Sequence, residues 1–437
     1  MTNPLPEQGE SRYTRQWIVP RMNLWRSLRG LPRDLWLLSL ATLINRLGTM
    51  AIPFLVLYLT RELGFSPQRS GLALGIYGAG AIVAAPISGR LVDRIGGLPI
   101  IRASLIGSGL MLLLYPFVHS FPAVIALTIA WSLLNESGRP AALTLVADLV
   151  PPEQRKPAYA LMRLAINLGM SVGPAAGGFI AAHSFKMIFF ANAAASLASG
   201  LFLILVPLSA TAHKRAVHAA SADDSVPRRA VFSDRPMMVF LFATFLVNIV
   251  FFQHEGVLPL FLVQDLNLST AFYGSLFTVN TLMIVFMEVP LNAATAHWPH
   301  RWALSLGSLL FAVGSGMFGF AHGPGMILAG IVIWTFGEMM LFPQASAYVA
   351  DVAPPHQRGA YMGAFSMAFS LSFAVAPWAG TAVYARFGAA VVWTLVFLIG
   401  LVAAGIMLRV TSEEPAPRLR SAIPSEPVEQ RREAVRQ

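Results

Sequence analysis

The sequence repeats itself at a fixed offset, and this feature restricts its fold more than any other. VADLVPPEQR at 146–155 returns as VADVAPPHQR at 349–358, so that matching residues stand 203 positions apart. The same offset relates further pairs: Asn45 and Asn248, Trp131 and Trp334, Pro140 and Pro343, and Pro174 and Pro377. Two related and largely apolar halves are typical of a membrane transporter whose site lies between the halves.

The hydrophobic pattern predicts helices that cross a membrane. Hydrophobic residues make up 56% of the chain and charged residues only 12%, against about 25% charged in soluble domains. The apolar stretches are continuous and about 20 residues or longer, which suits helices and not the alternating strands of a barrel. The fold class expected is therefore all-α integral membrane, with twelve transmembrane helices in two six-helix bundles. The expected spans are 35–60, 69–90, 98–118, 122–148, 158–182, 185–207, 236–263, 271–294, 302–321, 325–350, 358–382 and 388–409.

The breaks between the spans predict the organisation and orientation of the chain. Alternate loops are rich in Arg and Lys, whereas the loops on the other side hold only Arg61, Arg69, Lys186 and Arg386. By the positive-inside rule both termini are cytoplasmic, and the expected location is the inner membrane of a bacterium. The predicted segments are a cytoplasmic N-terminal segment (1–34), a six-helix bundle (35–207), a cytoplasmic linker (208–234), a second six-helix bundle (235–410) and a disordered tail (411–437).

Charge and cysteine content exclude several classes of function. The net charge of +10 arises in loops that flank the membrane, where it meets anionic lipid headgroups and indicates no nucleic-acid partner. The absence of cysteine excludes a disulfide framework and a thiolate metal site. We expect no cofactor and no metal. An enzyme is the least favoured class, because the sequence offers no nucleophile–base set.

A charged loop follows the second expected span. It reads GRLVDRIGG at 89–97 and resembles the G-x-L-x-D-R-x-G-[RK] signature between helices 2 and 3 of the major facilitator superfamily. The resemblance implies a cytoplasmic gate at Gly89, Arg90, Asp93 and Arg94, although position 97 is Gly instead of the usual basic residue. The alternative is a solvated turn without a gating role.

A glycine-rich stretch in the fifth span forms a second motif. NLGMSVGPAAGG at 167–178 resembles the antiporter motif G-x-x-x-G-P-x-x-G-G of the superfamily. Gly169, Gly173 and Gly177 recur every fourth residue and are expected to form a small-residue stripe that packs tightly against another helix. Pro174 can bend the helix, and Gly178 completes the motif. The alternative is ordinary helix packing with no bearing on the direction of transport.

Together these motifs make the whole chain similar to the twelve-helix drug:proton antiporters of the superfamily, nearest their multidrug-export branch. The resemblance implies alternating access, a small-molecule substrate, protons as the coupling ion and a monomer surrounded by membrane lipids. One position departs from the family, because Thr128 replaces a buried arginine that many members carry early in helix 4. Arg139 instead stands beside Pro140, so the proton relay of that missing arginine does not carry over.

Four charged residues are expected near the middle of the membrane. A charge at this depth costs roughly 2.5–3.5 kcal/mol by insertion scales, so it is seldom idle. Glu136 and Arg139 are three residues apart and can pair, with Arg46 as a competing partner. Glu338 has no basic residue near it in its own span and is the expected proton or cation site. The alternative is that all four form static bridges.

Several other polar residues are candidates for the cavity or for its gates. Asn45 and Asn248 occupy matching places in the first and seventh spans, and Glu255 lies nearer the outer end of the seventh. Four residues of the repeated segment lie where one span ends and the next begins, and they are expected to close the inner face by pairing between the halves: Asp148, Arg155, Asp351 and Arg358.

The function expected is proton-coupled efflux of small hydrophobic or amphipathic compounds. Two rivals remain. One is uptake or exchange of an organic anion, which Arg46 and Arg139 would bind. The other is a membrane sensor or assembly factor that transports nothing.

Overall fold

The computed structural model describes residues 30–151, 154–206, 208, 231–295, 297–354 and 357–410. Nearly all of the predicted N-terminal segment, most of the linker and the predicted tail lie outside the described residues. The described part is helical and contains no strand, so the predicted all-α class is confirmed.

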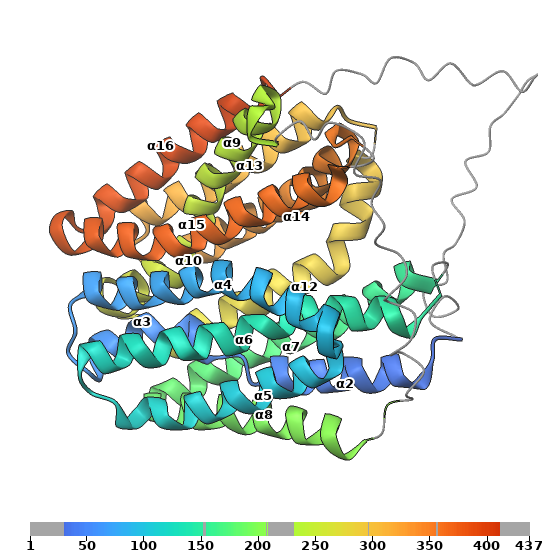
Figure 1. Ribbon diagram of the computed structural model, residues 1–437. Helices are drawn as coiled ribbons and strands as arrows, with labels where there is room; N and C mark the ends of the chain where they lie inside the picture. Colours follow the sequence, from blue (N-terminus) through green and yellow to red (C-terminus); the bar gives the residue numbers. More distant parts are fainter. Residues whose placement is uncertain are drawn as a thin grey trace, which may run out of the picture.

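The first half forms six spans from seven helices (Figure 1). In chain order they are α2 (Arg33–Leu47), α3 (Ala51–Arg61), α4 (Pro67–Ile95), α5 (Gly97–Leu114), α6 (Phe121–Leu149), α7 (Arg155–His183) and α8 (Phe185–Leu205). Helix α4 ends at Gly96, whose φ of 83° favours glycine. This left-handed residue turns the chain directly from α4 into α5.

The second half repeats the pattern (Figure 1). Its helices are α9 (Arg235–Phe251), α10 (Gln253–Gly256), α11 (Leu258–Leu260), the π-helical turn η6 (Phe261–Asp265), α12 (Thr270–Thr295), α13 (His300–Met317), α14 (Pro324–Val352), α15 (Arg358–Phe387) and α16 (Ala389–Met407). Helices α9 to η6 together make one span.

Eleven helical segments of the described chain are long and apolar enough to cross a membrane. The remaining predicted span is α6, which has 29 residues and reaches about 43 Å at 1.5 Å per residue. It carries Glu136 and Arg139 near its middle, which lowers its hydropathy but leaves its length sufficient. The structure therefore has the twelve expected spans.

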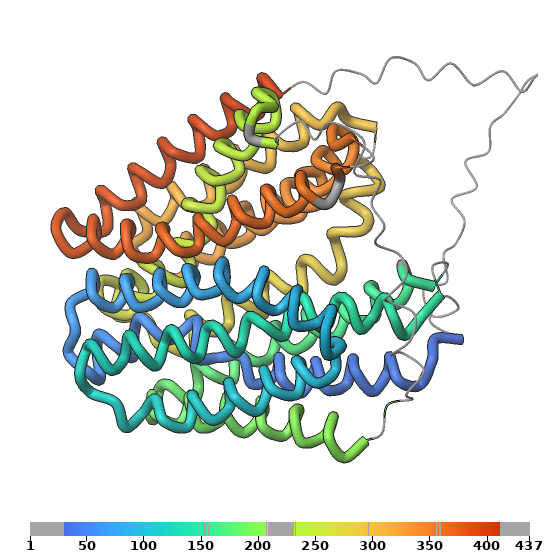
Figure 2. The backbone as a smooth tube through the Cα atoms, viewed as in Figure 1, coloured from blue at the N-terminus to red at the C-terminus, as the bar shows by residue number. Residues whose placement is uncertain are grey.

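The two bundles meet through small residues. Figure 2 shows the halves as two layers, and their broadest contacts join α4 to α15 and α7 to α12. A Cβ on Gly78 would lie 2.8 Å from the Ala374 nitrogen, and one on Gly178 would lie 2.5 Å from the Thr270 oxygen. Because glycine has no side chain at these crossings, the two backbones can touch.

The first and seventh spans are broken, where the sequence predicted continuous helices. The breaks fall at residues 48–50 and at Phe252, which the 203-residue offset places at equivalent points. In the first span Asn192 of α8 accepts hydrogen bonds from the backbone nitrogens of Met50 (3.3 Å) and Ala51 (3.1 Å). A buried amide thus satisfies the donors that the break releases.

The bundle has two ends. We call the end that carries Arg33, Leu205, Arg235 and Met407 the terminal face, and the opposite end the distal face (Figure 1). The halves are bonded together near the distal face, where Arg61 donates to the Val263 oxygen at 3.1 Å and Thr270 donates to the Gly178 oxygen at 2.8 Å. These contacts join the two halves at the distal face.

Candidate functional site

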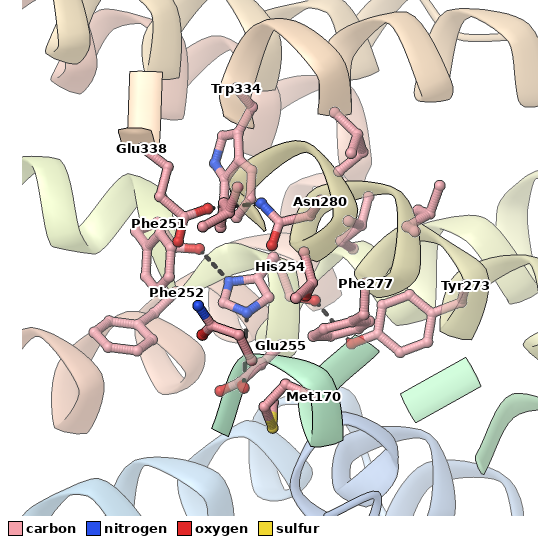
Figure 3. A pocket seen from close by; sticks show the side chains of 16 residues that line it. Met170, Phe251, Phe252, His254, Glu255, Tyr273, Phe277, Asn280, Trp334 and Glu338 are labelled. Atoms are coloured by element: carbon pink, nitrogen blue, oxygen red, sulfur yellow. Dashed lines mark hydrogen bonds and ion pairs between the residues drawn. The ribbon is translucent and has the colours of Figure 1, made fainter. Parts of the chain in front are cut away.

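A cavity of about 250 Å³ lies mainly in the second half, against α7 of the first (Figure 3). The broken seventh span, α12 and α14 supply most of its wall. The residues that line it are Asn167, Met170, Phe251, Phe252, His254, Glu255, Leu258, Tyr273, Leu276, Phe277, Asn280, Thr281, Ile284, Ile331, Trp334 and Glu338. Two of them, Glu255 and Glu338, are carboxylates that the sequence analysis singled out.

Glu338 reaches the cavity from α14 and has a neutral partner. The Asn280 amide of α12 donates to Glu338 Oε2 at 2.7 Å and also approaches Thr335 Oγ1 at 3.1 Å. No cationic side chain of the described residues lies within ion-pair distance of the Glu338 carboxylate. Within the part of the chain that the structure describes, Glu338 thus has a neutral hydrogen-bond donor and no ion-pair partner.

Glu255 faces a histidine whose orientation is set by the break in the helix. His254 Nδ1 lies 2.6 Å from the Phe251 oxygen, and His254 Nε2 lies 3.7 Å from Glu255 Oε1. A carbonyl oxygen can only accept, so Nδ1 carries the hydrogen and a neutral ring presents its Nε2 lone pair to the carboxyl group. The pair is attractive only when His254 or Glu255 holds an additional proton.

Aromatic rings make up the rest of the wall. Phe251 stacks on Trp334 with 5.3 Å between ring centroids and an interplanar angle of 6°. Phe252 and Phe277 also face the cavity (Figure 3), and the Tyr273 hydroxyl lies 2.9 Å from the His254 oxygen. Such faces attract cations through their quadrupoles and pack against apolar groups.

The predicted ion pair of the first half is absent from this conformation. Glu136 accepts from the Tyr77 hydroxyl at 2.8 Å and from the Asn135 amide at 3.2 Å. Within the described chain neither Arg46 nor Arg139 comes within 4 Å of its carboxylate oxygens, although Arg46 lies near enough to interact with Glu136 electrostatically. Neither arginine lines the cavity.

The two halves carry related polar contacts at equivalent positions. In the first half the Asn135 amide of α6 meets the Tyr77 hydroxyl of α4 at 2.6 Å. The offset takes Tyr77 to Asn280 and Asn135 to Glu338, which meet in the second half. The sequence analysis missed Asn280, and the repeat was the signal that could have found it.

The two predicted cavity amides lie elsewhere. Asn45 donates to Ser196 of α8 at 3.0 Å and so bridges two helices of its own half. Asn248 is 1% exposed and donates to the Thr244 oxygen at 2.8 Å. Neither amide lines the cavity.

The predicted gate residues between α4 and α5 lie mostly at the surface of the described structure. Arg90, Asp93 and Arg94 are exposed, and nothing lies within 4 Å of a Cβ built on Gly89. The Asp351 carboxylate meets His300 of its own half at 3.1 Å, which the sequence analysis did not foresee.

The other members of the expected inner pairing differ in how far they are buried. Arg155 is exposed, and Asp148 lies near the end of α6 with its side chain half-buried. The side chain of Arg358 lies outside the described residues. Instead, Arg163 of α7 meets Glu288 of α12 at 2.5 Å and 2.7 Å, and this ion pair joins the halves on the side of the cavity nearer the terminal face.

The glycine stripe of α7 packs against the break in the first span. A Cβ on Gly169 would collide with the Arg46 side chain, and one on Gly173 would lie 2.8 Å from the Arg46 oxygen. A Cβ on Gly177 would lie 2.7 Å from Met50 Cβ. The stripe therefore lets α7 approach the point at which the first span is broken, whereas Pro174 lies against Gly274 of α12.

The sequence matches the family model of the Major Facilitator Superfamily over residues 38–269 and 255–435. The chain belongs to the major facilitator superfamily. The crystal structure of the nucleoside transporter NupG has the same fold, with a TM-score of 0.72 at 12% identity over 87% of this chain and 99% of that one. Membership makes this protein a multi-pass secondary transporter.

Three bacterial relatives share parts of the sequence. The MFS-type transporter YqjV of Bacillus subtilis is 24% identical over 84% of this chain and 90% of its own length. A Na(+), Li(+), K(+)/H(+) antiporter of Planococcus maritimus is 22% identical over 75% and 84% of the two chains. The quinolone resistance protein NorA of Staphylococcus aureus is 28% identical over 36% and 40%.

Proposed function

We propose that this transporter exports small amphipathic organic cations in exchange for protons. The observation that carries the proposal is the placement of Glu255 and Glu338 in one aromatic cavity, with no Arg or Lys among the described residues within ion-pair distance of either carboxylate. The names of the antiporter and quinolone-resistance relatives agree with exchange and efflux. The same proposal includes the gating role predicted for the loop at 89–97 and the exchange role predicted for the motif at 167–178.

The cavity chemistry suits a ligand with one positive charge and an apolar body. A carboxylate that is removed from water and has no counter-ion is costly. Either a proton or a cationic ligand removes that cost, so the two compete for the same acceptor. The rings of Phe251 and Trp334 would then cover the apolar body of the ligand.

The proposal gives separate parts to the polar residues of the cavity and of the first half. Glu338, oriented by Asn280, is the main site at which proton and ligand exchange. His254 and Glu255 share a second proton, because a neutral Nε2 facing an ionised carboxylate is repulsive. In the first half, Glu136 is the acceptor for which Arg46, Arg139 and Tyr77 compete as the bundles move.

The gates follow from which face is closed. Hydrogen bonds join the two halves near the distal face in this conformation, whereas Asp93 and its neighbours are exposed at the terminal face. We assign the terminal face to the cytoplasm of a bacterial inner membrane, with both termini inside and the protein as a monomer. Segments 35–207 and 235–410 are the units that rock, and 208–234 links them.

Exchange of alkali cations for protons is a second candidate. A relative that carries this name covers 75% of the chain, and Glu338 and Thr335 present oxygen atoms on one face of α14. The aromatic wall favours an organic ligand over a metal ion. Organic-anion exchange is less well supported, because neither Arg46 nor Arg139 lines the cavity.

The test is proton movement in proteoliposomes that hold an imposed pH gradient. Lipophilic cations, neutral drugs, organic anions and alkali salts are added in turn to wild type, Glu338→Gln and Glu62→Gln. Glu62 is an exposed carboxylate at the distal end of α3 and serves as the matched control. We expect organic cations to release protons in wild type and Glu62→Gln but not in Glu338→Gln.

The other outcomes separate the alternatives. Proton release with Na⁺, Li⁺ or K⁺ alone would select the second candidate. Anion movement without protons would support the anion exchanger. Unchanged coupling in Glu338→Gln would remove Glu338 from the mechanism, and movement of none of these compounds would support a non-transporting role.

A further inference from the structure

A second hollow lies outside the transport cavity, at the terminal face. It is a groove of about 630 Å³ between the start of α9 and the end of α16. We call it the α9–α16 groove, and its lining residues are Arg235, Pro236, Met238, Val239, Phe242, Ile406, Arg409 and Val410. None of these residues lines the transport cavity or belongs to a predicted gate.

The rim of the α9–α16 groove carries two exposed positive charges. Arg235 opens α9 and Arg409 follows α16, and both are exposed. Among the described residues neither guanidinium makes a hydrogen bond or an ion pair. The nearby Asp234 carboxylate is engaged elsewhere, because it caps the Met237 nitrogen at 3.3 Å and accepts from the Tyr361 hydroxyl at 2.7 Å.

Below the rim the α9–α16 groove is lined by apolar residues, and further exposed apolar residues lie on both helices. Phe242 is 55% exposed, and Met238 and Val239 are exposed beside it on α9. On α16 the neighbouring Val402 and Leu398 are also exposed. In a membrane-spanning chain this surface faces the acyl chains, so the groove has a charged mouth at headgroup level and a hydrocarbon floor.

We propose that the α9–α16 groove binds an anionic glycerophospholipid from the surrounding membrane. The phosphate lies between the guanidinium groups of Arg235 and Arg409, which can each donate two hydrogen bonds to its oxygens. One acyl chain follows the apolar seam past Phe242. A basic pocket between helices at the membrane surface is the arrangement that selects anionic headgroups.

The seam favours a lipid over a free phosphate ion. A soluble anion would use the arginine rim alone and leave the apolar floor unoccupied. A bound lipid would also tie the start of α9 to the end of α16, and α9 leads to the break at Phe252. The inference rests on the membrane-spanning fold and not on the proposed substrate or coupling ion.

The test compares lipid retention in the full chain. Purified protein in neutral detergent is equilibrated with equimolar phosphatidylglycerol and phosphatidylcholine, and bound lipid is counted by native mass spectrometry. Because one arginine near a charged surface contributes about 1 kcal/mol, the affinity for phosphatidylglycerol should fall about fivefold in Arg235→Gln or Arg409→Gln and about 30-fold in the double variant. Phosphatidylcholine binding should stay unchanged.

Two matched variants test whether lipid binding depends on these two arginines in particular. Arg301→Gln removes another arginine of the terminal face, which lies over Trp302, and should leave lipid retention at the wild-type level. Arg235→Lys with Arg409→Lys should restore part of the lost affinity. Thermal unfolding checks that each variant is folded.

Three results would overturn the proposal. The first is equal phosphatidylglycerol retention in wild type and the double variant, as expected if other segments of the chain neutralise the arginines. The second is an equal loss in Arg301→Gln, which would indicate a non-specific surface charge effect. The third is glycerol phosphate displacing the lipid at similar concentration, because the apolar seam would then contribute nothing.

Discussion

Adding a methyl group to Gly178 is expected to open the distal face. The Cβ of Gly178→Ala would lie 2.5 Å from the Thr270 oxygen and 2.9 Å from the Ala271 Cα, against ordinary contacts of about 3.5–4.0 Å. Both neighbours are backbone atoms of α12, so relief requires α7 and α12 to separate by about 1 Å. Because overpacking of this kind costs about 1–3 kcal/mol, the distally closed state loses a population factor of about 5- to 150-fold.

The chain is well suited to measuring that shift, because it contains no cysteine. Thr281→Cys places a single thiol in the wall of the transport cavity. A membrane-impermeant maleimide applied from the distal side should label this thiol faster when Gly178→Ala is present. Maleimide applied from the terminal side should label it more slowly.

A second glycine provides the control for this experiment. Gly363 lies in α15, and nothing stands within 4 Å of a Cβ built on it, so Gly363→Ala should leave both labelling rates unchanged. Equal distal labelling with and without Gly178→Ala would refute the reasoning, since the contact would then not hold the distal face closed. A large change in Gly363→Ala would show that any added methyl group perturbs the bundle.

Three further predictions concern single contacts. Arg61→Ala removes the hydrogen bond to the Val263 oxygen and should weaken distal closure by about 0.5–1.5 kcal/mol, seen as faster distal labelling of Thr281→Cys. Asn192→Ala leaves two buried backbone nitrogens without an acceptor, so unfolding free energy should fall by about 2–5 kcal/mol, and an unchanged melting temperature would contradict this. Arg163→Gln breaks the ion pair to Glu288, and because the arginine is 61% exposed, the free energy of unfolding should change by less than about 1 kcal/mol. Labelling of Thr281→Cys from the terminal side should become faster in this variant. An unchanged labelling rate would exclude a gating role for the ion pair.

The fold could be predicted from the sequence because it depends on the length and hydrophobicity of whole segments and on their repetition along the chain. Apolar runs of spanning length and the 203-residue repeat do not depend on which side chains meet. The breaks at 48–50 and at Phe252 were missed, since Gly48 and Pro53 only weaken a helix locally. The break in the first span is stabilised by Asn192, which lies 142 residues from Met50 in the chain. Its side chain accepts hydrogen bonds from the backbone nitrogens that the break leaves without helical partners.

The site was predicted in part, for a related reason. Depth along a span identified Glu338 and Glu255 as intramembrane charges, and both line the cavity. Spacing along α6 favoured a pair between Glu136 and Arg139, but the Tyr77 hydroxyl of a neighbouring helix reaches the carboxylate instead. Partners on other helices depend on packing, which a single sequence shows only where the repeat exposes it.

The equivalent polar contacts of the two halves differ in where the ionisable carboxylate stands. In the first half the tyrosine and the amide at this crossing both donate to the neighbouring Glu136, whereas in the second half the carboxylate of Glu338 takes part in the crossing itself, with Asn280 as its donor. The two halves thus share the position of this contact but not the residue types that make it. In the proposed exchange, the ionisable carboxylate therefore stands at the crossing in the second half and one residue beyond it in the first.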